Sequence, residues 1–253
     1  MDNNIVIALL LATGAGLSTT IGSVMGLAVR KPGPKFMAFT LGFSAGVMLL
    51  VSFVELLPSS IDAIGFLPAH IGFFLGILCM LLIDALIPHD YIDQHDHHGP
   101  KAGDTQKRLG LLVAFGIGIH NFPEGMATFA GTLEDVHLGI AIAVAIAIHN
   151  IPEGLAVSVP VYAATGSRKQ AFLWSFLSGV SEPIGALLAA VVLLPFLTPT
   201  VLGWVLAAVA GIMVAISLDE LVPAAKSFGA DHAPIIGATI GMAVMALSLW
   251  LLL

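Results

Sequence analysis

The chain has 253 residues, of which 58% are hydrophobic and only 10% charged, and its mean hydropathy is +1.01. A soluble domain carries about 25% charged residues, so this composition excludes a water-soluble fold and indicates a surface that faces lipid. The formal net charge of −7 gives no reason to expect a nucleic-acid partner, and the single cysteine, Cys79, excludes an intramolecular disulfide.

Apolar runs between polar or Pro/Gly breaks predict eight membrane-spanning helices. A span needs about 20 residues, and the chain has room for eight of them with short connections. Residues 140–148 alternate with period two, as a strand would, but both faces would be apolar and a lone strand cannot cross lipid, so we expect a helix there. The predicted spans are Ile5–Val29, Phe36–Leu57, Pro68–Ile87, Leu109–Ala130, Leu138–Ala164, Gln170–Leu194, Val201–Ala224 and Pro234–Leu253.

The nine Lys and Arg residues all fall in alternate connections between these spans. They lie at 30–35, at 101–108, at 168–169 and at 226, whereas the other connections and both ends of the chain carry none. Basic residues accumulate in cytoplasmic loops. We therefore expect these four connections in the cytoplasm and both termini outside it. The first apolar run has no basic residue before it and is too long for a secretory signal, so we expect it to be a span.

A segment of the second predicted span recurs in the seventh. Residues 45–58 and 210–223 are identical at seven of fourteen positions, with shared Met, Ser, Glu and Pro. The charge pattern predicts that the second span runs from the cytoplasm to the outside and the seventh from the outside to the cytoplasm, so the copies would have opposite orientations. Inverted repeats of this kind are common in transporters, whose substrate site lies near the middle of the membrane. Chance likeness of two apolar helices is the alternative.

The fourth and fifth predicted spans carry the same polar hexapeptide, His-Asn-x-Pro-Glu-Gly, at 120–125 and 149–154. Ionisable side chains inside a membrane are costly and usually functional. His and Glu stand four residues apart in each copy, which places them on one helix face. Pro123 and Pro152 lack an N–H, so each frees a carbonyl oxygen next to these side chains. The duplicated motif therefore predicts a cation site between adjoining spans.

The residue types indicate which cation this site would bind. Imidazole, carboxylate and amide oxygen without cysteine suit zinc, iron(II), cobalt or manganese, and do not suit Cu(I). Several facing carboxylates also allow a bridged pair of metal ions. The predicted ligands in the two motifs are His120, Asn121, Glu124, His149, Asn150 and Glu153.

Other polar residues in the spans leave alternatives open. The duplicated His and Glu residues could instead form a proton relay or a structural hydrogen-bond network. Glu182, before Pro183, fits a metal ligand or a structural partner, and Met48 and Met213 fit core packing as well as metal binding. Four acidic residues lie toward span ends, where interfacial water explains them, so we do not expect them to be primary ligands: Glu55, Asp84, Asp219 and Glu220.

The connection after the third span is rich in His and Asp over residues 89–98. Such tracts bind metal ions weakly. On the cytoplasmic side this loop, at about 89–108, could receive or sense ions, or it could be a solvated linker.

With its eight spans, outside termini and paired motifs, the sequence resembles the ZIP family of metal transporters along essentially the whole chain. The resemblance implies an all-α fold in which an inverted repeat, spans one to three and six to eight, flanks the fourth and fifth spans. It implies one transporter domain, 1–253, a binuclear metal centre, uptake into the cytoplasm through a bacterial inner membrane, sliding of one helix bundle against another, and a homodimer. Its ligands would be His120, Asn121, Glu124, His149, Asn150, Glu153, Glu182 and Met48.

The expected function is therefore transport of divalent metal ions, chiefly zinc, with iron(II), manganese, cobalt or cadmium as further substrates and with no cofactor. The alternative is an intramembrane metal-dependent hydrolase. That enzyme would need a metal-bound water and a general base, but the H-E-x-x-H motif is absent because each motif His is followed by Asn. A proton-relay channel would not explain the duplicated Asn. We do not expect an enzyme.

The charge pattern makes a topology prediction. In a variant without Cys79, a cysteine at Thr105 should react with an impermeant thiol reagent only from the cytoplasmic side, and a cysteine at Glu134 only from outside. Labelling of intact cells and of inverted vesicles measures this. Reaction of both positions from the same side would contradict the eight-span model.

Overall fold

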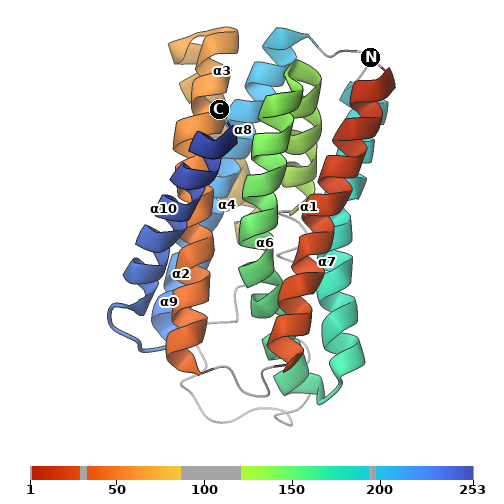
Figure 1. The fold of residues 1–253 in the computed structure, drawn as a ribbon. Helices are drawn as coiled ribbons and strands as arrows, with labels where there is room; N and C mark the ends of the chain where they lie inside the picture. Colours follow the sequence, from red (N-terminus) through yellow and green to blue (C-terminus); the bar gives the residue numbers. More distant parts are fainter. Residues whose placement is uncertain (1, 29–32, 87–120, 194–195, 197, 253) are drawn as a thin grey trace.

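The computed structural model describes residues 2–28, 33–86, 121–193, 196 and 198–252, and the regular structure in them is helical (Figure 1). A helix at 121–134 precedes α6, and π-helical turns occupy Ser52–Leu56, Ala189–Leu193 and Ser217–Leu221. The other helices are α1 Asp2–Ala28, α2 Pro34–Val51, α3 Leu57–Ile64, α4 Phe66–Leu86, α6 Val136–Thr165, α7 Arg168–Leu188, α8 Pro199–Ile216, α9 Val222–Ser227 and α10 Ala233–Leu252.

Local sequence signals set the ends of several helices. The carboxylate of Asp135 accepts hydrogen bonds from the backbone N–H groups of His137 and Leu138 and so caps the start of α6. That helix ends at Gly166, whose φ of 65° is in the left-handed region that glycine adopts without strain. The hydroxyl of Ser167 then caps α7. The two capping residues, Gly166 and Ser167, thus form the whole connection between the two helices.

The second predicted span is longer than the sequence indicated. We predicted its end at Leu57, because Pro58 removes a backbone donor, but the helix continues as α3 to Ile64. A π-helical turn, Ser52–Leu56, lies just before the proline, and this wider turn lets the helix pass the missing donor without stopping. The same arrangement recurs in the seventh span, where the turn Ser217–Leu221 lies just before Pro223.

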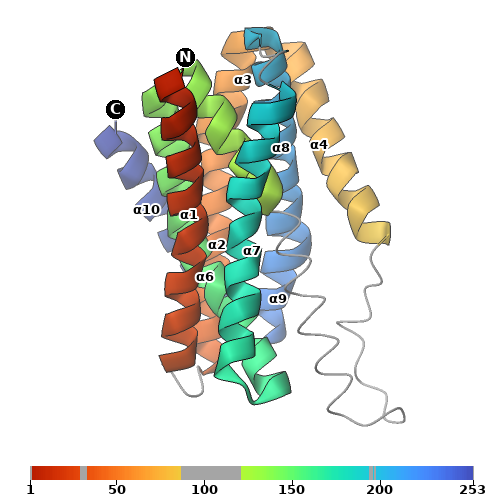
Figure 2. The ribbon, with the colours of Figure 1, turned by 90° about the vertical axis from the view of Figure 1, so that its right-hand side faces the viewer.

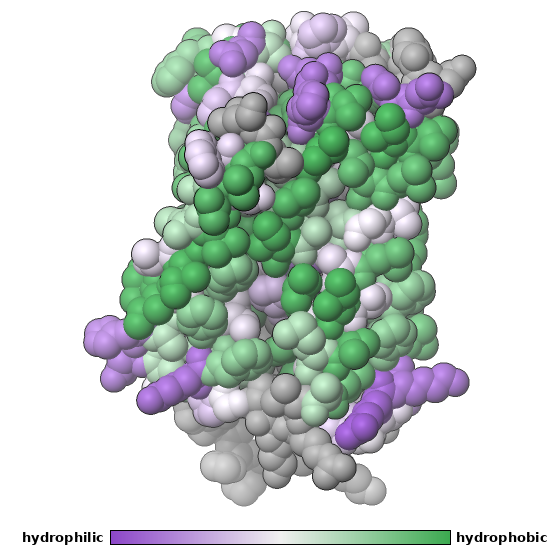
Figure 3. All heavy atoms as spheres, viewed as in Figure 1, coloured by the Kyte–Doolittle hydropathy of each residue, from purple (hydrophilic) through white to green (hydrophobic). Residues whose placement is uncertain are grey.

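Seven helical segments in the described part of the chain are long and apolar enough to cross a membrane, from Asn3–Ala28 to Ala233–Leu251. They correspond to seven predicted spans. The fourth, Leu109–Ala130, lies only partly within the described residues, where 121–134 is helical. Apolar side chains cover most of the middle of the face in Figure 3, and hydrophilic ones gather at both ends. The predicted class, an all-helical protein with several membrane spans, is confirmed.

The four basic residues that the structure describes occupy one end of the bundle. Lys35 lies in the first turn of α2, Arg168 and Lys169 begin α7, and Lys226 is in the last turn of α9. Figure 1 places these positions at the end opposite to the start of α1 and the finish of α10. Segregation at one end is what the alternating charge pattern predicted.

The described helices form two groups. In the first, called the α6 group here, α1 packs against α6 and α7, and the helix at 121–134 lies against α6 and α7. In the second, the α2 group, α2 packs against α9 and α10, and α8 packs against α3 and α4. Figures 1 and 2 show the groups as neighbouring sets of long helices. They meet where α2 and α10 contact α6.

Glycine contacts join helices within each group but do not join the groups. The backbone of Gly154 on α6 touches that of Thr19 on α1, and Gly46 on α2 touches Ala238 on α10. Each described glycine that is packed closely against another helix touches a helix of its own group. Small residues allow helix backbones to approach and interlock in a membrane. Each group is therefore tightly interlocked, whereas their common interface has no such contact among the described residues.

The glycine contacts predict a stability difference. Gly46→Ala should lower the free energy of unfolding by about 1–3 kcal/mol, because the added methyl group would overlap the backbone of Ala238. Gly14→Ala is the matched control, since a methyl group there meets open space, and it should melt at or slightly above the wild-type temperature. Thermal unfolding of the purified protein in detergent measures both. Equal melting temperatures would contradict this packing.

Candidate metal centre

The buried ionisable side chains of the described residues gather on three helices. Glu124 lies on the helix at 121–134, His149 and Glu153 lie on α6, and Glu182 lies on α7, each at most 2% exposed. Among the other His, Asp, Glu, Lys and Arg residues whose side chains the structure describes, none is buried. The close approach of Gly125 to the backbone of Glu182 brings two of these helices together.

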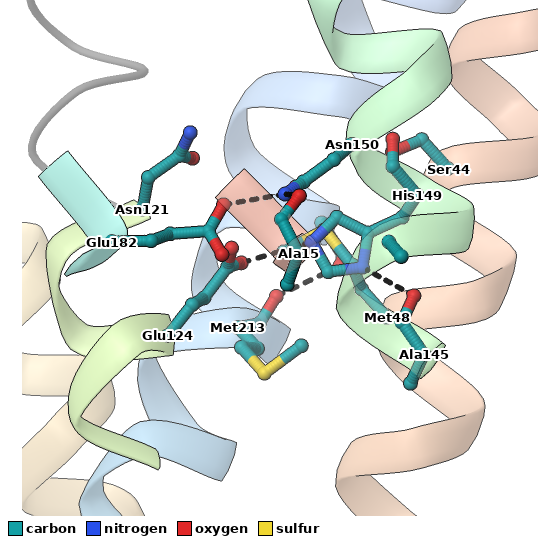
Figure 4. Close-up of polar contacts among 12 residues, drawn as sticks. Ala15, Ser44, Met48, Asn121, Glu124, Ala145, His149, Asn150, Glu182 and Met213 are labelled. Atoms are coloured by element: carbon teal, nitrogen blue, oxygen red, sulfur yellow. Dashed lines mark hydrogen bonds and ion pairs between the residues drawn. The ribbon is translucent and has the colours of Figure 1, made fainter. Parts of the chain in front are cut away.

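His149 and Glu124 form a direct contact across two helices. Nε2 of His149 lies 3.1 Å from Oε1 of Glu124, and Nδ1 lies 3.1 Å from the carbonyl oxygen of Ala145, one turn back on α6 (Figure 4). A carbonyl oxygen only accepts, so Nδ1 carries the proton in the neutral ring. The contact of Nε2 with Glu124 holds a further proton between the nitrogen and the oxygen; when that proton leaves, the neutral ring keeps its proton on Nδ1 and presents the Nε2 lone pair toward Glu124. This is the tautomer that a metal ion bound between the two side chains requires.

Asn150 and Glu182 form a second pair beside the first. The Asn150 amide donates to Oε1 of Glu182 and to the carbonyl oxygen of Ala15 on α1, the latter at 2.9 Å. Both amide protons are thereby used, which orients the amide oxygen away from these partners. Sequence reasoning did not include α1 in the site. Its contribution is a backbone carbonyl, which no side-chain motif can reveal.

Three buried oxygen atoms of these pairs have no hydrogen-bond partner among the described residues: Oε2 of Glu124, Oδ1 of Asn150 and Oε2 of Glu182. A buried polar atom without a partner is costly. Each of these oxygens is an acceptor, so a cation would satisfy all three. Imidazole nitrogen with carboxylate and amide oxygen is a donor set that suits zinc and its neighbours.

The side chains of this site include suitable donor atoms for a metal ion, but they are not arranged as the ligands of one ion. No three His, Cys, Asp or Glu side chains in the described part of the chain lie together in a metal-binding arrangement. His149 contacts Glu124 and Asn150 contacts Glu182, so a metal ion would replace contacts that these side chains make with one another. When ionised, the carboxylates of Glu124 and Glu153 also repel that of Glu182. A cation among them would relieve this repulsion.

The other predicted ligands have different surroundings. The Asn121 amide donates to the backbone and hydroxyl oxygens of Ser178 on α7, at 3.3 and 3.4 Å. Met48 and Met213 are fully buried, and Figure 4 draws both in the same close-up as His149. His120 and the His-rich loop lie outside the described residues.

Acidic residues gather at the end of the bundle opposite to the basic residues. Partial burial raises the pKa of Glu134, and the nearby charges of Asp135 and Asp62 raise it further. Asp62 comes from α3 of the α2 group, Glu134 from the end of the helix at 121–134 and Asp135 from the cap of α6, so both groups contribute negative charge to this end. Such a potential attracts cations from solution.

Comparison with known proteins identifies the family. The family model described as ZIP zinc transporter matches residues 85–249. The chain is 54% identical to the zinc transporter ZupT of Chlorobium luteolum, over 99% of both chains. It is 50% identical to that of Nitratidesulfovibrio vulgaris, over 100% of this chain and 99% of the relative, and 49% identical to that of Corynebacterium aurimucosum, over 93% of each.

The chain belongs to the ZIP zinc transporter family. The family resemblance predicted from the paired motifs is therefore confirmed, and with it a multi-pass membrane protein whose relatives are bacterial. Membership in a transporter family also decides against the intramembrane hydrolase.

Within this ZIP chain, Glu124 is the residue whose loss should affect metal binding most clearly. Glu124→Gln should weaken zinc binding by about ten-fold or more, because it removes the charge that faces Nε2 of His149. Equilibrium zinc titration of the purified protein measures this. Glu134→Gln is the control, a glutamate in the last turn of the same helix and outside the buried pairs, and should bind zinc like the wild type. Unchanged affinity of Glu124→Gln would show that Glu124 is not a ligand.

Proposed function

We propose that this ZIP chain carries zinc across the bacterial inner membrane into the cytoplasm, and that iron(II), manganese, cobalt and cadmium use the same site. The observation that carries this proposal is the buried pair of His149 and Glu124, beside oxygens of Glu124, Asn150 and Glu182 that have no hydrogen-bond partner among the described residues. Four ionisable side chains fully withdrawn from solvent are costly in a membrane protein. A transported cation gives them a function.

The proposed centre holds two metal positions bridged by carboxylates. Zinc would exchange its water shell for imidazole nitrogen and for carboxylate and amide oxygens that the fold holds in place. The paired atoms, together with the oxygens that have no partner among the described residues, support this arrangement, since each contact between two ligands can open to admit an ion. The proposed ligands are His120, Asn121, Glu124, His149, Asn150, Glu153 and Glu182, with Met48 from the facing helix.

We also propose that the second and seventh spans are copies in an inverted repeat, within a single transporter domain of residues 1–253. Their directions support this, because α2 and α8 run in opposite directions in Figure 1. The local structure agrees as well. Ser52 donates to the carbonyl of Met48, and Ser217 donates to that of Met213, each at 2.7 Å and each at the start of a π-helical turn.

Transport requires that the site open to each side of the membrane in turn, and we propose that the α6 group slides against the α2 group to do so. The glycine contacts support this division, since they interlock helices within each group and none joins the two. The metal-binding motifs lie in the α6 group and would move with it. The basic end of the bundle would face the cytoplasm and both termini the outside.

Uptake into vesicles tests the function directly. Purified protein in lipid vesicles should accumulate radioactive zinc faster than vesicles without protein. His149→Asp exchanges a nitrogen ligand for oxygen, which favours the harder manganese ion. We therefore expect the ratio of zinc to manganese uptake, measured in competition, to fall several-fold.

The control for this experiment is His70→Asp, since His70 lies on α4, in the other group, and its ring contacts only the carbonyl of Phe66 and the Phe66 ring among the contacts described. Its uptake ratio should equal that of the wild type. Absence of zinc accumulation would contradict the proposed function. An unchanged ratio in His149→Asp would show only that the His149 imidazole does not contact the transported ion.

A further inference from the structure

One side-chain hydrogen bond joins the two helix groups in the described part of the chain. The hydroxyl of Ser44 on α2 donates to the carbonyl oxygen of His149 on α6, at 3.3 Å. The other described hydrogen bonds between a side chain and a different helix stay within one group. Examples are Asn150 to Ala15 in the α6 group and Ser60 to Gly203 in the α2 group.

The two ends of this bond both lie next to the metal centre. On α6 it reaches the backbone of His149, whose imidazole faces Glu124. On α2 it starts four residues before Met48, so the Ser44 hydroxyl and the Met48 thioether stand on the same face of the helix. Both residues are 1% exposed, and Figure 4 shows them on the α2 side of His149.

Buried apolar side chains of α2 and α6 pack in one core at the interface between the groups, and the Ser44 hydrogen bond adds a directional contact to that packing. Glycine contacts determine how helices align inside each group, but none does so where α2 meets α6. A hydrogen bond between helices in a membrane changes an equilibrium by about three-fold on average. A single bond is therefore strong enough to favour one alignment and weak enough to break when the groups move.

We infer that Ser44 is a positioning residue that aligns α2 with α6, so that the sulfur of Met48 and Nε2 of His149 can contact the same cation. This rests on the proposed function, because it assumes a metal ion at His149. Ser44 itself need not touch the ion. Its effect passes through Met48, whose thioether is a soft ligand that favours Cd²⁺ over Mn²⁺. Loss of the hydroxyl should thus change selectivity rather than abolish binding.

Competitive equilibrium binding of Cd²⁺ and Mn²⁺ to the purified full chain tests this inference. Ser44→Ala should lower the ratio of Cd²⁺ to Mn²⁺ affinity by about three-fold, in the same direction as Met48→Leu. The double variant should show no larger change than Met48→Leu alone, because both substitutions remove the same contribution, the contact of the cation with the Met48 thioether. Ser44→Thr, which keeps the hydroxyl, should restore most of the wild-type ratio.

Ser60→Ala is the matched control. Its hydroxyl is equally buried and donates to the carbonyl of Gly203 at 2.8 Å, but within the α2 group. Its affinity ratio should equal that of the wild type. Alanine is favourable in a helix, so the Ser44 variant is expected to fold, and thermal unfolding checks this.

The inference is overturned if the affinity ratio is unchanged in Ser44→Ala or in Met48→Leu, if the two effects add, or if Ser60→Ala lowers the ratio equally. Glu124→Gln separates this result from the proposed function. If Glu124→Gln binds both metals like the wild type, the metal centre itself is misplaced. If it loses binding while Ser44→Ala keeps the wild-type ratio, only the role of Ser44 is wrong.

Discussion

Withdrawing a charged side chain from water costs free energy, and a membrane offers few ways to recover it. In this protein that constraint falls on Glu124, His149, Glu153 and Glu182, which are all buried among three helices. Pairing His149 with Glu124 and Asn150 with Glu182 meets the demand in part, but it leaves carboxylate and amide oxygens without partners among the described residues. The centre is therefore stable enough to form and remains suited to a cation.

Placing these side chains in contact requires helix backbones to come unusually close. Gly125 and Gly154 follow the motif glutamates directly, and each touches the backbone of a neighbouring helix, at Glu182 and Thr19 respectively. The motif thus places a proposed ligand and the glycine that positions it in adjacent residues. The same kind of contact organises the α2 group through Gly46 and Ala238. Because neither set extends to the other group, tight packing around the centre is compatible with movement between groups.

Much of the fold could be predicted because lipid imposes simple rules. Span length and apolar composition located seven helices to within a few residues, and the alternating Lys and Arg residues separated the two ends of the bundle. The prediction failed at Pro58, where a π-helical turn lets the helix continue. Rules based on local sequence treat a proline as the end of a helix. Only the packing of the whole segment decides whether a wider turn is stable enough for the helix to continue past the proline.

The sequence by itself determined the membrane environment, the number of predicted spans, the family and the residue types at the candidate metal centre, because composition, period and a duplicated motif are local properties. Tertiary structure alone decided which of these residues meet. It paired His149 with Glu124 and Asn150 with Glu182, turned Asn121 toward Ser178, and added Ala15 and Ser44. These contacts join residues up to 135 positions apart. They depend on how helices rotate and align against one another, which no single segment encodes.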